Sequence, residues 1–153
     1  MRAKAIDTSI DVDIKIMLVN YFGTVAMTKA VLPSMIKRKE GRILCIGSVQ
    51  GKFAIPHRSA YGASKKALQG FCDSLRAEIA EHNVKVTLIC PGYVATSLSL
   101  NALTGSGSSY GEMDASTASG YDRFKLAQEI LQNVLADKKD VMIAQIAPRL
   151  AYY

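Results

Sequence analysis

Two side chains that could act together in proton transfer lie four residues apart, in the segment 61–65, which reads Tyr-Gly-Ala-Ser-Lys. On a helix, residues four apart project from adjacent turns of one face, so the phenol of Tyr61 and the ammonium of Lys65 would be neighbours. A nearby cation favours the phenolate and lowers the pKa of a tyrosine from its reference of about 10, which makes Tyr61 a usable acid or base near neutral pH. The same spacing is also typical of a packed ring beside a solvated amine.

A third candidate, Ser48, follows the short apolar run 42–47, which has the length and branching of a strand buried on both faces. Tyr61 lies thirteen positions later (61 − 48), far enough for a loop to return its hydroxyl beside that of Ser48. A carbonyl oxygen between the two could accept a hydrogen bond from Ser48 and a proton from Tyr61. Hydride would come from a separate donor, because no protein side chain supplies it.

The elements that must position these residues alternate along the chain. We expect helix, strand, helix, strand, helix and strand at residues 8–40, 42–47, 59–83, 84–90, 121–136 and 141–145. This alternation predicts a parallel sheet with right-handed crossovers, in which ligands bind at the carboxyl ends of the strands. Ser48 and the segment after Pro91 both emerge at that edge, and Tyr61 begins the helix that follows Ser48.

Two further segments carry expectations of their own. The first helix is apolar around much of its circumference, which suggests cover on more than one side, with Pro33 as a kink or a new turn and Gly41 as the stop. Residues 97–121 are rich in Ser, Thr, Gly and Ala with almost no periodicity. Loops of that length are usually functional or disordered.

Composition narrows the class of protein. The chain has 153 residues, is 49% hydrophobic and 21% charged, and so has the composition and length of one globular domain. Its net charge of +6 is dispersed, and the densest basic run, 37–42, is typical of a solvated helix end. No basic stripe with interleaved aromatics is present, so no nucleic-acid partner is expected.

Cysteine and histidine usage excludes other classes. The three cysteines lie far apart among apolar neighbours, which indicates buried thiols in a reducing, intracellular compartment: Cys45, Cys72 and Cys90. With only two histidines, His57 and His82, neither a metal site nor a Ser-His-Asp triad is expected. No uncharged apolar run reaches about 18 residues, so membrane contact is expected only through a segment outside this chain.

Taken together, residues 41–51, 61–65 and 91–96 resemble the second half of a short-chain dehydrogenase/reductase, in order and in spacing. Within that family the subgroup called member 7B is similar in the stretches 20–23, 32–37, 61–76 and 110–114. The resemblance implies an α/β fold: a partial Rossmann-type, doubly wound parallel sheet comprising the last three strands and their flanking helices. Residues 1–153 would be a single partial domain without its amino-terminal half, and residues 97–121 would be a mobile substrate lid.

The resemblance also implies roles for four catalytic residues. Tyr61 would be the general acid in reduction and the base in oxidation, and Ser48 would orient and stabilise the substrate oxygen. Lys65 would lower the pKa of Tyr61 and bind the cofactor ribose. Asn20 would hold a water in a proton relay to Lys65; without the family, Asn20 is an ordinary polar residue in a helix bend. Tyr61 and Lys65 would also contact the cofactor.

Cofactor and partners follow from the same resemblance. The remaining cofactor-binding residues would be Pro91, Gly92, Val94 and Thr96, with Thr96 on the nicotinamide carboxamide. NADP(H) is expected rather than NAD(H). The substrate would be a lipid-like carbonyl or secondary alcohol, such as a sterol, a retinoid or acyl-dihydroxyacetone phosphate. A homo-oligomer would form through the helices that contain Asn20 and Tyr61, and the full-length parent would be attached to the endoplasmic reticulum or peroxisomal membrane.

The chain departs from the family pattern before these residues. No glycine-rich turn between a first strand and helix precedes them, so the usual pyrophosphate site is not expected. The favoured interpretation is a fragment of an NAD(P)-dependent oxidoreductase with an incomplete cofactor site. The alternative is an inactive short isoform that acts as an interaction or dimerisation module.

Overall fold

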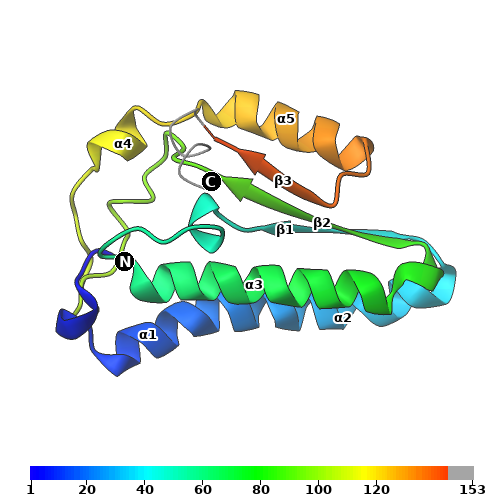
Figure 1. Cartoon of the computed structure of the whole chain (residues 1–153), viewed down its shortest axis with the longest axis horizontal. Coiled ribbons are helices and arrows are strands. Elements are labelled where there is room, and N and C mark those ends of the chain that lie inside the picture. Colours follow the sequence, from blue (N-terminus) through cyan, green and yellow to red (C-terminus); the bar gives the residue numbers. More distant parts are fainter. Residues whose placement is uncertain (145–153) are drawn as a thin grey trace.

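The computed structural model describes residues 1–144, and their strands form one parallel sheet (Figure 1). The sheet has the order β1-β2-β3, with strands β1 (Gly41–Ile46), β2 (Val84–Pro91) and β3 (Asp140–Ile143). Ile43 pairs with Val86, and Ile89 pairs with Val141. The predicted α/β architecture is therefore confirmed. The third strand is confirmed through Ile143, and Gln145 lies outside the described residues.

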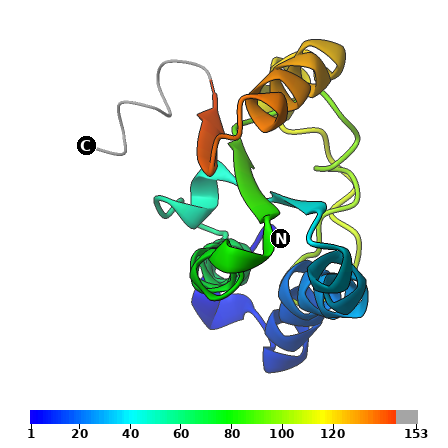
Figure 2. The ribbon, with the colours of Figure 1, turned by 90° about the vertical axis from the view of Figure 1, so that its right-hand side faces the viewer.

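Helices cover both faces of this sheet. Helices α2 and α3 lie together against one face and α5 lies against the other (Figures 1 and 2). The helices are α1 (Ile10–Met17), a π-helical turn (Leu18–Phe22), α2 (Gly23–Arg38), α3 (Ser59–Glu78), α4 (Ala115–Ala118) and α5 (Arg123–Leu135). Short 3₁₀ turns occur at Ala5–Asp7, Val49–Gly51 and Ala80–His82.

The residues of β2, the central strand, are buried to a greater extent than those of β1. Nearly every residue of β2 is buried, because α3 packs on one face and α5 on the other. In β1 only alternate residues are buried, and Leu44 and Ile46 remain 41% and 46% exposed. The prediction that this strand is buried on both faces was wrong in the described part of the chain. The reason is that the buried contacts of α5 are with β2 and β3.

The first helical stretch runs from α1 through the π-helical turn into α2, and α2 continues through Pro33 as one helix. It ends at Arg38, and Lys39 adopts the left-handed conformation (φ 52°) with its N–H on the Ile36 carbonyl. Gly41 is the first residue of β1 and not the helix stop that the sequence suggested. By length and composition alone, the stretch Ile10–Arg38 could cross a membrane, a test that core helices of soluble proteins also pass.

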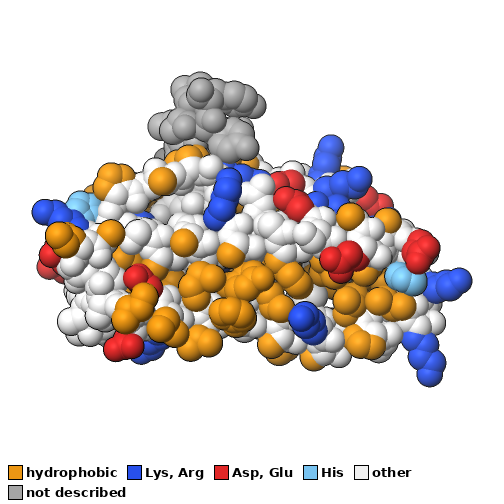
Figure 3. Space-filling view, turned by 60° about the horizontal axis from the view of Figure 1, so that its bottom comes forward, with side chains coloured by type: hydrophobic (Ala, Val, Ile, Leu, Met, Phe, Trp, Pro, Cys, Tyr) orange, Lys and Arg blue, Asp and Glu red, His pale blue; other side chains and the backbone are white. Residues whose placement is uncertain are grey.

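One side of this helical stretch is open. Apolar side chains of α1, the π-helical turn and α2 are exposed, where the sequence had suggested cover on more than one side: Ile10, Ile14, Leu18, Val19, Phe22, Met27 and Val31. We refer to these seven residues as the apolar band. Figure 3 brings the helical side forward and shows apolar side chains gathered across it.

Residues 97–121 are mostly turns and irregular backbone, with one short helix and one bridge within the segment. An antiparallel bridge joins Leu103 to Ser109, and α4 follows. Ser99 is fully buried; its hydroxyl donates to the Met113 sulfur (3.2 Å) and accepts from the Asp114 N–H (3.2 Å). The segment returns to the sheet at a bridge between Val94 and Tyr121. We call residues 97–121 the lid segment.

Candidate active site

Ser48 is fixed at the carboxyl end of β1. The Gly47 N–H continues the ladder to the Ile89 carbonyl (2.7 Å), and the chain then turns into the 3₁₀ turn. The Ser48 hydroxyl caps that turn by accepting a hydrogen bond from the Gln50 N–H (3.1 Å). Ser48 is only 6% exposed. Its oxygen is therefore held in one place before any ligand binds, as a positioning group requires.

The 3₁₀ turn packs directly against the helix that carries Tyr61 and Lys65. A Cβ on Gly51 would lie 2.9 Å from the Lys65 carbonyl oxygen, so only glycine allows this approach. Tyr61 and Lys65 lie on adjacent turns of α3, and the Lys65 Nζ is 5.8 Å from the centre of the Tyr61 ring. The same Nζ donates to the Ile46 carbonyl (2.9 Å) at the end of β1. The sheet edge and α3 thus hold the three predicted groups together.

Asn20 lies in the π-helical turn, which accounts for the helix bend expected there. Such turns are frequent at functional sites. The Asn20 Nδ2 donates to the Ser64 hydroxyl (3.0 Å), and that hydroxyl donates to the Tyr61 carbonyl (2.7 Å). Ser64 is fully buried. The serine between Tyr61 and Lys65 therefore links Asn20 to the helix, a connection that the spacing of the residues did not reveal.

The protonation of Tyr61 differs from the sequence-based expectation. Burial raises the pKa of Tyr61 above its ordinary value, while the Ser48 hydroxyl, Arg58 and Arg2 act in the opposite direction. Lys65 is not the group that decides this pKa, and burial lowers the pKa of Lys65 itself. The expectation that the Tyr61 pKa falls was therefore wrong for this chain. The physical reason is that removing the phenol from water disfavours the phenolate more than the nearby cations favour it.

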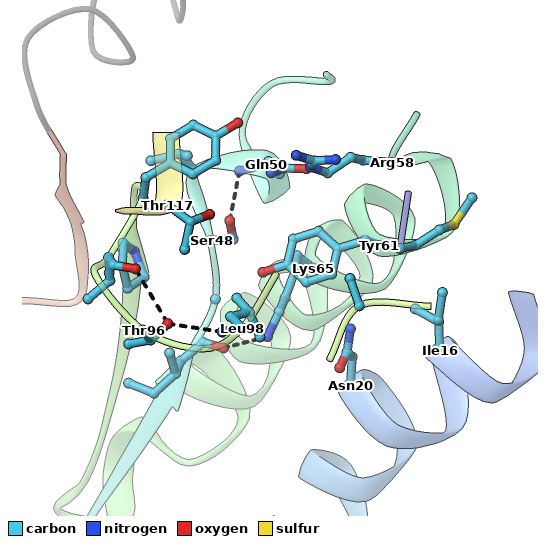
Figure 4. Close-up of a pocket in the computed structure, with 18 of the residues that line it drawn as sticks. Ile16, Asn20, Ser48, Gln50, Arg58, Tyr61, Lys65, Thr96, Leu98 and Thr117 are labelled. Carbon is cyan, nitrogen blue, oxygen red and sulfur yellow. Dashed lines mark hydrogen bonds between the residues drawn. The ribbon is translucent and has the colours of Figure 1, made fainter. Parts of the chain in front are cut away.

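All eight predicted site residues line one cavity of about 550 Å³ (Figure 4): Asn20, Ser48, Tyr61, Lys65, Pro91, Gly92, Val94 and Thr96. Thr96 is exposed, and its hydroxyl lies 3.4 Å from the Val94 carbonyl. The Gly92 N–H donates to the Ile143 carbonyl (2.8 Å), and a Cβ there would lie 2.9 Å from that of Ala144. Glycine is thus also required at this position by packing against the end of β3.

A charged cluster at the same cavity was not among the features predicted from the sequence. Arg2 and Arg58 line it, and both contact the carboxylate of Asp114 in the lid segment. The Arg2 Nε lies 3.1 Å from Asp114 Oδ1, and the Arg58 Nη2 lies 3.5 Å from Oδ2. Arg2 and Arg58 are 112 and 56 positions from Asp114 in the sequence. Only the place of Arg58, three residues before Tyr61, could have suggested that it belongs to the site.

The arrangement of hydroxyl and amine groups could serve carbonyl chemistry, and the cavity could admit a small ligand. Pockets of this size accommodate small-molecule ligands. Of the three N–H donors on Lys65, the hydrogen bond to Ile46 uses one. Ser48 and Tyr61 line the same cavity, and their hydroxyls could both donate hydrogen bonds to one substrate oxygen. Among residues 1–144 no group of three or more His, Cys, Asp or Glu side chains could hold a metal ion.

Known proteins are similar over the whole chain. A family model described as short chain dehydrogenase matches residues 3–105. The dehydrogenase/reductase SDR family protein 7-like of Anopheles gambiae is 67% identical over 153 residues, which are 100% of this chain and 48% of that protein. The dehydrogenase/reductase SDR family member 7B of Mus musculus is 54% identical over 147 residues, 96% of this chain and 46% of that protein.

A solved structure is similar as well. A short-chain dehydrogenase from Burkholderia cenocepacia in complex with NADP has a TM-score of 0.70 and 25% identity, over 88% of this chain and 51% of that chain. The chain thus spans about half the length of the relatives it matches. The parallel sheet with helices on both faces is the corresponding part of their Rossmann-type fold. This chain belongs to the short-chain dehydrogenase/reductase family.

Proposed function

We propose that this chain carries the catalytic half of an NAD(P)-dependent oxidoreductase that interconverts a carbonyl and a secondary alcohol. The observation that carries this proposal is the meeting of Asn20, Ser48, Tyr61 and Lys65 around one cavity. Bound nicotinamide supplies or accepts the hydride. Every other step falls to side chains of this chain.

In the direction of reduction, the Tyr61 phenol donates its proton to the substrate oxygen. The Ser48 hydroxyl donates a hydrogen bond to the same oxygen and stabilises the charge that develops on it. Asn20 would hold a water that relays a proton toward Lys65. Burial raises the pKa of Tyr61, so the phenol is protonated at neutral pH but is a weaker acid than an unburied phenol, and the Ser48 hydroxyl and the two arginines partly offset that rise.

Cofactor contacts would come from Tyr61, Lys65 and four residues at the end of β2: Pro91, Gly92, Val94 and Thr96. NADP(H) is proposed over NAD(H), and the similarity to a dehydrogenase in complex with NADP supports it. These residues belong to the nicotinamide end of the site. In a chain half the length of its relatives, we propose that the cofactor site is incomplete.

The substrate is proposed to be a lipid-like carbonyl compound held under the lid segment. Apolar side chains dominate the far wall of the cavity, among them Ile16, Val19, Leu98 and Leu103. Sterols, retinoids and acyl-dihydroxyacetone phosphate fit such a wall. Arg2 and Arg58 share the single carboxylate of Asp114, so this cluster has a surplus of one positive charge, and Lys15 and Lys65 also line the cavity; a substrate with an anionic group would be favoured.

The decisive experiment uses the full-length protein that contains this chain. Tyr61→Phe should reduce turnover at least about a hundredfold, because the proton donor is lost while the ring remains. Tyr21→Phe is the matched control, since Tyr21 packs in the core against Phe71 (ring centres 6.4 Å apart). Unchanged folding by circular dichroism is required of both variants. Wild-type turnover in Tyr61→Phe would show the proposal to be wrong.

A second candidate function rests on the apolar band. An inactive short isoform that dimerises or binds a partner through these side chains would need no cofactor. Calorimetric titration of the chain with NADPH tests the interaction module, which predicts no heat of binding; tight binding would contradict it.

Two further observations support proposals on the cellular compartment and the oligomeric state of the protein. All three cysteines are free and buried, which supports a reducing intracellular compartment. We propose a homo-oligomer through the helices that contain Asn20 and Tyr61, supported by the apolar band. Attachment of the full-length parent to the endoplasmic reticulum or peroxisomal membrane remains part of the same proposal, and cell fractionation of the parent tests it.

A further inference from the structure

Three segments far apart in the sequence meet in one ion cluster beside Tyr61. Arg2 precedes α1, Arg58 is the residue before α3, and Asp114 is the residue before α4. The Asp114 carboxylate binds Arg2 through both oxygens, with Nε on Oδ1 and Nη2 on Oδ2, and Arg58 approaches Oδ2. Paired contacts of this kind between a guanidinium and a carboxylate are the strong, geometrically specific form of ion pair.

The cluster is shielded from water. The side chains of Arg2, Arg58 and Asp114 are only 14%, 11% and 18% exposed. Charges in such places are screened far less by salt than charges on the surface. The ion pairs between Asp137 and its partners Arg42 and Lys85 offer a contrast, because all three of those side chains are more than 40% exposed. Losing the Asp114 carboxylate should therefore have a larger effect than losing that of Asp137.

The same carboxylate is built into the lid segment. The Asp114 N–H donates to the buried Ser99 hydroxyl. Two backbone hydrogen bonds tie the lid segment to the residues before α1, from the Arg2 N–H to the Leu103 carbonyl (2.8 Å) and from the Ser9 N–H to the Gly105 carbonyl (3.0 Å). The position of the lid segment and the position of the two guanidinium groups are thus fixed together.

We infer that Asp114 is a positioning residue, which latches the lid segment over the cavity and in the same contact holds the Arg2 and Arg58 guanidinium groups beside the Tyr61 phenol. When the lid segment is in this position, the positive charges of Arg2 and Arg58 are held near Tyr61, the proposed proton donor. We call the contact of Asp114 with Arg2 and Arg58 the latch. Its effect on Tyr61 as a proton donor rests on the proposed function, whereas its effect on the position of the lid segment does not.

The electrostatic surroundings of Tyr61 support this coupling. Arg58 and Arg2 both act to lower the pKa of Tyr61, against the upward effect of burial. The other titratable groups around the cavity come from separate elements: the Met1 amino group before α1, Lys15 on α1, Lys65 on α3, Cys90 on β2 and Tyr93 after β2. A further tyrosine of the lid segment, Tyr110, has Arg2 over its ring (5.8 Å). None of these six contacts Asp114 in a hydrogen bond or ion pair of the described residues. Loss of the Asp114 carboxylate should release the two arginines and leave the first five groups in place.

The first test is hydrogen–deuterium exchange of the chain. In wild type, the amides of Thr104, Tyr110 and Gly111 are protected by backbone hydrogen bonds within the lid segment. Asp114→Asn should speed exchange of the lid segment roughly tenfold or more, while amides of β2 keep their wild-type rates. Asp137→Asn is the matched control and should change nothing in the lid segment. Wild-type exchange of the lid segment in Asp114→Asn would overturn the inference.

A second variant covers the case in which Asp114→Asn fails to fold. Arg58→Gln removes one partner of the latch and should also speed exchange of the lid segment, whereas Arg58→Lys should restore part of the protection. If both Asp114→Asn and Arg58→Gln fold, the double variant should exchange no faster than the faster single variant. The reason is that both substitutions break the same contact, between Arg58 and Asp114. Full additivity of the two effects would contradict a shared latch.

The second test reads the phenol directly. Tyrosine labelled with ¹³C at Cζ reports each phenol by NMR, and Tyr61→Phe identifies the Tyr61 signal. Asp114→Asn should raise the pKa of Tyr61, because the guanidinium groups are no longer held beside it, and Asp137→Asn should leave it unchanged. A lower pKa in Asp114→Asn would mean that the arginines stay without their carboxylate, and would refute the latch. Neither test uses turnover, so failure of the proposed activity would not be confused with failure of the latch.

Discussion

At the scale of the residue, the central feature is a phenol taken out of water beside several cations. Burial is the largest cause that raises the pKa of Tyr61, Cys90 acts in the same direction, and the Ser48 hydroxyl and two arginines moderate the rise without reversing it. Lys65 shares the burial, and its own pKa falls. In both cases burial disfavours the charged form of the group.

The raised pKa of Tyr61 predicts a specific loss of stability in alkali. The folded state keeps its proton more tightly than the unfolded chain does, so the stabilising contribution is complete below the unfolded pKa of about 10 and disappears as pH rises through the folded pKa. Urea unfolding near neutral pH and above about pH 10 should show a larger loss of stability in wild type than in Tyr61→Phe. An equal loss in both would contradict this assignment.

Ser64 offers a second prediction at this scale. Its hydroxyl joins Asn20 to the Tyr61 carbonyl in a fully buried place. Ser64→Ala should lower the free energy of unfolding by about 1–3 kcal/mol, because the Asn20 amide loses a buried partner. Ser34→Ala is the control. Ser34 is exposed on α2, and its hydroxyl bonds only to groups of the same helix, the Val31 carbonyl and the Arg38 guanidinium. Similar urea midpoints for the two variants would argue against the link.

At the scale of the element, the site depends on how closely the 3₁₀ turn after β1 approaches α3. Ser48 precedes the turn and the helix carries Tyr61 and Lys65, so the separation of turn and helix sets the distance between the Ser48 and Tyr61 hydroxyls. Gly51 makes that approach possible, because its missing side chain would otherwise meet the Lys65 carbonyl. Backbone packing, more than any side-chain contact, sets this distance.

Two alanine substitutions test that dependence. Gly51→Ala should destabilise the chain by about 1–3 kcal/mol, because a rigid backbone lies 2.9 Å from the new Cβ. Gly70 lies on α3, and a Cβ added there would meet no neighbouring atom within 4 Å. Gly70→Ala should therefore stabilise α3 by about 0.5–1 kcal/mol. Thermal unfolding of both variants should move in opposite directions. A rise in Tm for Gly51→Ala would show that the turn can retreat without cost.

At the scale of the whole molecule, one side of the described chain is apolar and open. The apolar band runs along α1 and α2, and β1 lies at an edge of the sheet with Leu44 and Ile46 exposed. Open apolar surface of this kind indicates an interaction site or a tendency to associate. The relatives of the chain are about twice its length, so in them further residues are available to this side.

The apolar band predicts self-association of the chain by itself. Met27→Lys should weaken that association in sedimentation velocity, because a charge is placed where 70% of an apolar side chain is exposed on α2. Leu135→Lys on α5 changes an equally exposed side chain (76%) outside the band and should leave association unaltered. The same weakening in both variants, or a wild type that stays monomeric at high concentration, would refute the band as the interface.

Much of this organisation follows from the sequence alone. The order of helices and strands, the parallel sheet, the buried free thiols and eight of the residues around the cavity were predicted from periodicity, spacing and family motifs. Such features are encoded locally: a strand needs its own apolar run, and Tyr61 and Lys65 share a face because they are four apart on one helix.

Only the tertiary structure decided the rest. The direction of the Tyr61 pKa, the one-sided burial of β1, the bridge through Ser64 and the cluster around Asp114 each depend on segments distant in the sequence. Burial and charge are sums over neighbours in space, and no local pattern states which neighbours those are. The sequence therefore determined which groups could do the chemistry, and the fold determined the charges and contacts under which they would do it.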